Sequence, residues 1–140
     1  MTASASEHHS AVPVPSAAVV DGVFDLARNG QTAPLAEMLD AGVPLELVNA
    51  RGDSLLIVAA YAQHRDTVQE LLRRGADTAV VNGMGQTAIA CAVFRNNETI
   101  LTDLLQAGAD PSVGSPTGLQ IADQFGLPGM RAVIEAHLSA

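Results

Sequence analysis

Residues 49–77 (NARGDSLLIVAAYAQHRDTVQELLRRGAD) and residues 82–110 (NGMGQTAIACAVFRNNETILTDLLQAGAD) repeat one sequence pattern at a fixed distance. Both stretches begin with Asn and end with Gly-Ala-Asp, and corresponding positions are 33 residues apart (82 − 49 and 110 − 77). Gly42 precedes Gly75 by the same interval (75 − 42). A period of this length is typical of solenoids, in which each supersecondary unit packs on its neighbours. The pattern therefore predicts a chain of stacked repeats.

Within each unit, the residue pattern predicts two short helices joined by a turn. Ser54 and Thr87 are suited to cap the first helix of the two central units, and Leu71 and Leu104 lie on the inward stripe of the second. A glycine follows each second helix and can adopt the left-handed conformation that ends a helix. We therefore predict an all-α solenoid of about four helix-turn-helix repeats with short finger loops. The repeats are expected at about residues 18–48, 49–81, 82–114 and 115–140.

The first and last repeats are less regular, as expected for units that have only one neighbour. In the first repeat, Asp21 is the predicted N-cap. Residues 1–17 contain Pro13 and Pro15 and are predicted to be a disordered tail. In the last repeat, Thr117 is the predicted cap. Its core face is expected to comprise Leu119, Ile121, Ala122, Val133, Ile134 and Leu138.

The composition restricts the class of partner. The chain has 140 residues, a net charge of −8 and a pI near 4.7. Such a surface repels phosphate, so we expect no nucleic acid, and encounter with a basic partner is favoured. No apolar run is long enough to cross a membrane, and the pattern of a signal peptide is missing. A single cysteine, Cys91, fits a reducing compartment. We expect a cytoplasmic protein that does not bind membranes.

No group of residues has the spacing of a catalytic or metal site. His8 and His9 lie in the predicted tail, where they supply too few fixed ligands for a metal ion. His64 lies in a predicted interhelical turn, where it is expected to form a turn hydrogen bond. Cys91 is expected to be a small buried residue in the first helix of its repeat. We therefore expect no enzymatic activity, no metal and no cofactor.

The tripeptide Arg51-Gly52-Asp53 has the sequence of an integrin-adhesion motif. Its glycine recurs one period later as Gly85, so the repeat itself accounts for Gly52 (85 − 52 = 33). We interpret the tripeptide as part of a finger loop.

The two Gly-Ala-Asp segments, the glycine spacing and the helix starts resemble the ankyrin-repeat family. The resemblance covers about residues 20–138 and is closest to small, stand-alone bacterial ankyrin proteins. Helix starts in the family follow Thr-Pro-Leu-His-x-Ala; here Ser54, Thr87 and Thr117 keep the hydroxyl group, but the His is missing. In the family that His bridges neighbouring repeats. The resemblance therefore implies the ankyrin fold with this polar bridge weakened or replaced by apolar contact.

In ankyrin proteins, partners usually lie across the concave side formed by the finger tips and the exposed ends of the first helices. We therefore expect a monomeric, non-catalytic module that binds another protein. Two alternatives remain: a dedicated accessory or inhibitory subunit of one enzyme, and a self-assembling protein. By register, the resemblance implies a concave surface made of finger tips and helix ends: Ala50, Arg51, Asp53, Gly83, Met84, Gln86, Arg28, Asn29, Tyr61, Ala62, Phe94, Arg95, Gln124 and Phe125. From these positions we predict a protein-binding set of Arg51, Asp53, Tyr61, Met84, Gln86, Phe94, Arg95 and Gln124. The alternative for Phe94 and Phe125 is that they fill the junctions between repeats.

Overall fold

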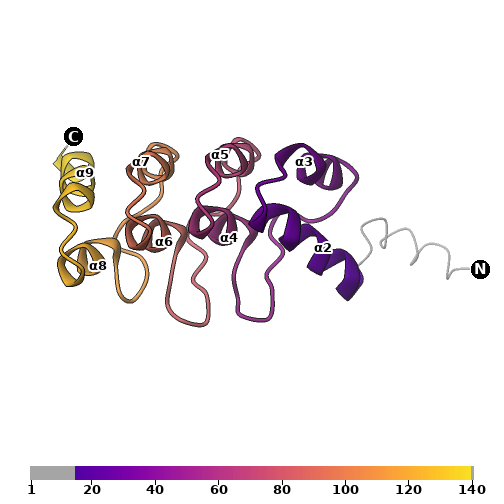
Figure 1. Ribbon diagram of the computed structural model, residues 1–140, viewed down its shortest axis with the longest axis horizontal. Helices are drawn as coiled ribbons and strands as arrows, with labels where there is room; N and C mark the ends of the chain where they lie inside the picture. The colour runs from indigo at the N-terminus through magenta and orange to yellow at the C-terminus, as the bar shows by residue number, and fades with distance from the viewer. Residues whose placement is uncertain (1–14, 140) are drawn as a thin grey trace, which may run out of the picture.

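The computed structural model describes residues 15–139, which form eight α-helices and no β-strand (Figure 1). The predicted all-α solenoid is therefore confirmed. The helices form four successive helix-turn-helix pairs. These are α2 (Ala17–Arg28) with α3 (Thr32–Asp40), α4 (Leu55–Tyr61) with α5 (Arg65–Arg73), α6 (Ala88–Phe94) with α7 (Glu98–Gln106), and α8 (Gly118–Gln124) with α9 (Pro128–Ser139).

The pairs stack in two layers. Figure 1 shows α2, α4, α6 and α8 in an inner row and α3, α5, α7 and α9 in an outer row. The loops before α4, α6 and α8 extend beyond the inner row as fingers. Both α4 and α6 have a neighbour on each side, and every residue of these helices is buried except the last, Tyr61 and Phe94. The two aromatic rings therefore stand at the exposed edge of the inner layer.

The outer layer is amphipathic and highly charged. In α5, Val68 and Leu71 are buried, whereas the arginines lie on the outer face. Arg74 bonds Glu70 at 2.6 Å and reaches back to Asp40 at 2.8 Å. Arg65 of the same helix reaches forward to the carboxylate of Asp103 in α7 at 2.9 Å. Ion pairs between neighbouring repeats thus neutralise charge on the outer face.

The predicted caps and turns explain why the helices are so short. The hydroxyl oxygens of Ser54, Thr87 and Thr117 each accept a hydrogen bond from the backbone N–H three residues later. Thr117 forms a full capping box, because the Gln120 side chain accepts from its backbone N–H. The glycines that end the outer helices have positive φ, as predicted. Their φ values are 109° at Gly42, 87° at Gly75 and 94° at Gly108.

Apolar contact takes the place of the polar bridge that the His forms between repeats in the ankyrin family. Ile57 and Ala90 occupy the position of the family's His, and both are buried in the core. Polar links between repeats lie elsewhere, in the ion pairs of the outer layer and in the fingers. The N–H of Gly83 donates to the carbonyl oxygen of Arg51 at 2.8 Å.

Two predictions at the ends of the solenoid are wrong. The cap of α2 is Ser16 and not Asp21: the Ser16 hydroxyl oxygen accepts a hydrogen bond from the N–H of Val19. Pro15 precedes this cap and so does not interrupt the helix, while Val19 packs against the core. Helix α2 therefore begins at Ala17, within the predicted tail, and residues 1–14 of that tail lie outside the described residues.

In α9, Leu138 is 57% exposed, although it was predicted to lie in the core. Helix α9 packs mainly on α7 and α8, and Leu138 lies one turn beyond the buried Ile134, at the end of the helix. Ile134 is buried as predicted, and Met130, which was not predicted, is buried beside it.

Candidate protein-binding groove

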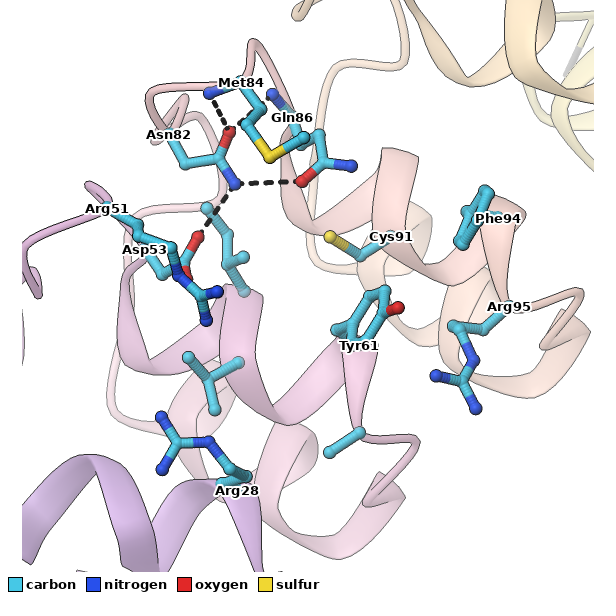
Figure 2. A pocket seen from close by; sticks show the side chains of 13 residues that line it. Arg28, Arg51, Asp53, Tyr61, Asn82, Met84, Gln86, Cys91, Phe94 and Arg95 are labelled. Atoms are coloured by element: carbon cyan, nitrogen blue, oxygen red, sulfur yellow. Dashed lines mark hydrogen bonds and ion pairs between the residues drawn. The ribbon is translucent and has the colours of Figure 1, made fainter.

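A groove of about 550 Å³ runs along the exposed edge of the inner layer (Figure 2). Its walls come from the end of α2, from α4 and α6, and from the fingers that precede α4 and α6. It is lined by Arg28, Arg51, Asp53, Ile57, Val58, Tyr61, Ala62, Asn82, Met84, Gln86, Cys91, Phe94 and Arg95. These include every residue of the predicted protein-binding set except Gln124.

Three aromatic rings form a row at the edge of the inner layer. Tyr61 and Phe94 end α4 and α6 one period apart, and their rings stack with centroids 6.3 Å apart and planes at 13°. Phe125, the C-cap of α8, meets the Phe94 ring edge-on at 5.4 Å. The exposed fractions are 44%, 44% and 53% respectively. The row is therefore held by mutual contact but remains open to solvent on one side.

Arg95 is fixed against the same row. Its guanidinium carbon lies 4.8 Å from the centroid of the Tyr61 ring, which is within the range of a cation–π contact. Because Arg95 caps the C-terminus of α6, its position follows from the same register that sets Phe94. One cation and two rings are thus presented together.

The fingers are shaped by a repeated asparagine. The Asn82 side-chain oxygen accepts from the N–H groups of Met84 and Gln86, both at 2.9 Å, and Asn49 does the same in the preceding finger. This leaves Met84 at the tip of its finger with 72% of its surface exposed. The side chain of Gln86 is drawn inward, because its oxygen accepts from Nδ2 of Asn82 at 3.0 Å.

Asp53 was predicted to be a partner-contacting finger residue, but its geometry indicates a structural role. It is 7% exposed, and Oδ1 accepts a hydrogen bond from Nδ2 of Asn82 at 2.8 Å (Figure 2). Gly52, with φ of 82°, makes the tight turn that directs Asp53 inward. An adhesion tripeptide needs an exposed carboxylate, so this geometry favours the finger interpretation of Arg51-Gly52-Asp53.

The register placed both Gln124 and Phe125 at the C-terminal end of the row, and only Phe125 joins it. Gln124 is exposed in the last turn of α8 and does not line the groove. The neighbouring Phe125 supplies the contact with Phe94 instead. Arg28 lines the groove at a helix end that the register implied, whereas Asn82 lines it without having been predicted. The period of 33 residues that relates Asn82 to Asn49 was the available signal for that residue.

The titratable groups near the groove favour structural roles. Cys91 is buried as predicted, and burial raises the pKa of its thiol to about 12, so the thiol is neutral near neutral pH and a poor nucleophile. His64 bonds through Nε2 to the carbonyl oxygen of Arg28 at 2.9 Å, which connects its turn to the preceding repeat. Within residues 15–139, no three His, Cys, Asp or Glu residues are grouped as metal ligands would be. His8 and His9 lie outside these residues.

Comparison with known proteins gives two results. A family model described as ankyrin repeats (3 copies) matches residues 23–115. A Pseudomonas aeruginosa protein named as an ankyrin repeat protein is 48% identical over 50 residues. That segment spans 36% of this chain and 29% of the relative, so the likeness covers less than a third of the relative's length. Over the residues that the structure describes, every helix is too short or too polar to cross a membrane.

Proposed function

This chain belongs to the ankyrin-repeat family, and we propose from that premise that it is a non-catalytic module that binds a partner protein in the groove. Proteins of this family generally mediate protein–protein interaction. The observation that carries the proposal is the row of half-exposed rings beside Met84. Exposed apolar side chains gathered in one hollow indicate an interaction site more strongly than isolated ones.

The chemistry of the groove suits a protein partner. Tyr61 and Phe94 can lose the remainder of their exposed area to a partner side chain, and aromatic anchors of this kind dominate binding energy at interfaces. Arg95 adds a donor whose direction is already set by the Tyr61 ring. Little conformational entropy therefore needs to be lost when the groove is occupied.

Affinity purification from cells that naturally contain the protein tests this proposal. Tagged wild-type chain would be compared with the double variant Tyr61→Ala/Phe94→Ala and with Leu138→Ala, which removes an exposed apolar side chain from α9. We expect quantitative mass spectrometry to find at least one protein that the wild type and Leu138→Ala retain and the double variant loses. Each ring should contribute about 2 kcal/mol to affinity for that protein.

Two results would change the interpretation. Equal recovery of all partners by the three proteins would place the binding surface outside the groove. Recovery of a single enzyme in a fixed molar ratio to the tagged chain would favour the alternative function, in which the chain is a dedicated accessory or inhibitory subunit of that enzyme. Circular dichroism of each variant is needed to show that the folded protein was compared.

A further inference from the structure

The arginines of this chain occupy two different environments. Four of them pair with carboxylates through contacts of 3.0 Å or less outside the groove, in α5 and α9. These are Arg65, Arg73, Arg74 and Arg131. The remaining three, Arg28, Arg51 and Arg95, all line the groove. Figure 2 shows Arg28 and Arg51 entering it from α2 and the first finger, and Arg95 from the end of α6 beside Tyr61.

Two of the three groove arginines, Arg51 and Arg95, are less completely neutralised. Arg51 lies 3.5 Å from Asp53 and keeps 73% of its side chain exposed, while the carboxylate of Asp53 also accepts from Asn82. Within residues 15–139, Arg95 has no carboxylate at ion-pair distance. Arg28 pairs with Asp25 at 2.6 Å and is 45% exposed.

The sign of the local charge is therefore opposite to that of the whole chain. The lining contains three guanidinium groups and one carboxylate, Asp53. Two further carboxylates, Asp21 and Asp25 of α2, line the adjoining hollow at one end of the groove. In the outer layer, Asp40, Glu70 and Asp103 are paired with arginines at 2.9 Å or less, so these pairs contribute little net charge to the groove.

The apolar surface lies among these cations. Tyr61, Phe94 and Met84 are exposed and line the same groove as Arg51 and Arg95. An occupant that fits both features has an apolar side chain for the rings and carboxylates on its flanks for the guanidinium groups. A basic occupant would place its charge beside three arginines, although the net charge of −8 favours a basic partner.

Resting on the proposed function, we propose that the groove binds an acidic segment of its partner protein, in which Asp or Glu residues flank a large apolar side chain. The carboxylates bond to Arg51 and Arg95, and the apolar side chain covers Tyr61 and Phe94. Asp21 and Asp25 exclude further carboxylates at the α2 end, so they set the direction in which the segment lies.

Selection from a random peptide library displayed on phage tests this inference with the full chain as the target. The selected peptides would be synthesised with a fluorescent label, and their dissociation constants measured by anisotropy. The proteins compared are the wild type, Arg51→Gln, Arg95→Gln and Tyr61→Ala. Arg73→Gln is the matched control, because it removes the same charge from an exposed arginine on α5. A second arm replaces each peptide carboxylate with the corresponding amide.

We expect the selected peptides to be rich in Asp and Glu beside Leu, Phe or Trp. Arg51→Gln and Arg95→Gln should each weaken binding about tenfold, as should the amide peptides, whereas Arg73→Gln should leave binding almost unchanged. Neutral or basic peptides that lose binding with Tyr61→Ala but not with either groove arginine variant would overturn the acidic occupant and leave the proposed function standing. Peptides unaffected by any groove substitution, or a selection that yields none, would contradict both.

Discussion

Nδ2 of Asn82 donates a hydrogen bond of 2.8 Å to Oδ1 of Asp53, and this bond joins the fingers of two successive repeats. Both residues are buried, with exposed fractions of 8% and 7%. The same Asn82 side chain accepts from two backbone N–H groups of its own finger. One side chain therefore sets the shape of a finger and its position on the neighbouring finger.

Replacing Asn82 by Ala should lower the free energy of unfolding by about 2–3 kcal/mol, because it removes the partner of Oδ1 of Asp53, of the Gln86 side-chain oxygen and of two backbone donors. Asn49→Ala is the matched control. This substitution removes the equivalent contacts within the preceding finger. Nδ2 of Asn49 lies 3.4 Å from the Asp53 carboxylate and Asn49 is half-buried, so we expect the free energy of unfolding to fall by only about 1 kcal/mol. Urea unfolding followed by circular dichroism measures both. Equal losses would show that the bond between fingers adds nothing.

Leu71 and Leu104 hold equivalent positions in α5 and α7 and are completely buried. Replacing either by Ala should lower the free energy of unfolding by about 2–5 kcal/mol, because a cavity forms between the layers. Leu72→Ala, at a partly buried position next to Leu71, should cost about 1 kcal/mol. Thermal unfolding is the measurement, and a melting temperature unchanged by both core substitutions would contradict the packing described here.

Gly85 and Gly108 both have positive φ, at 81° and 94°, but their surroundings differ. A Cβ on Gly108 would meet nothing, so Gly108→Ala should cost only the backbone strain, about 1 kcal/mol. A Cβ on Gly85 would overlap the backbone carbonyl oxygen of Ser115. It would also disturb the bond of 2.9 Å from the Ser115 N–H to the Gly85 carbonyl oxygen. Gly85→Ala should therefore be clearly the more destabilising in urea unfolding, and the reverse order would refute this contact between the last two fingers.

The raised pKa of Cys91 makes stability depend on pH in the alkaline range. The thiol pKa is 9.0 when unperturbed and about 12 in the folded protein, mainly because of burial. The folded state holds the proton more tightly, so the stabilising contribution is complete below about pH 9 and is lost as the pH rises towards 12. The free energy of unfolding of the wild type should fall more steeply above pH 9 than that of Cys91→Ala. Parallel pH profiles of the two proteins would contradict the burial of the thiol.

The same cysteine should react with a thiol reagent only when the protein opens. Near pH 8, a thiol whose pKa is about 12 is almost wholly protonated and also shielded from the reagent. We expect labelling to be slow in buffer and fast in urea. Rapid labelling of the folded protein would show that the groove wall at Cys91 is open.

Much of the fold could be predicted because the repeat makes its determinants local. The caps Ser54 and Thr87 act within one turn of helix, and Gly75 ends its helix by its own φ, so spacing alone identified them. At the start of α2 no second copy of the pattern was available for comparison, and Ser16 was missed for that reason. Leu138 was misplaced because spacing within α9 continues the stripe of Ile134, whereas its exposure depends on contacts with other helices, which spacing does not specify.

The candidate groove could be predicted only in outline. Alignment of the repeats placed Tyr61 and Phe94 side by side, since equivalent residues of adjacent repeats must be neighbours. It could not show that Asp53 turns inward, because that depends on Asn82 in another finger. Side chains that bond across repeats are set by three-dimensional contact, which a period of 33 residues does not specify.

Contact between Arg95 and Tyr61 gives the last prediction. Half-exposed residues are expected to change stability by no more than about 0.5 kcal/mol when truncated, but the Tyr61 ring stacks on Phe94 and carries the guanidinium group of Arg95. Tyr61→Ala should therefore cost about 1 kcal/mol. A double-mutant cycle with Arg95→Ala should give a coupling energy of about 0.5 kcal/mol.

Tyr61→Phe is the control, since it keeps the ring under the cation and should retain most of the coupling. Because Tyr61 is the only tyrosine and the chain has no tryptophan, near-ultraviolet circular dichroism reports the ring directly. An unchanged tyrosine signal in Arg95→Ala, together with zero coupling, would show that the guanidinium group does not rest on the ring.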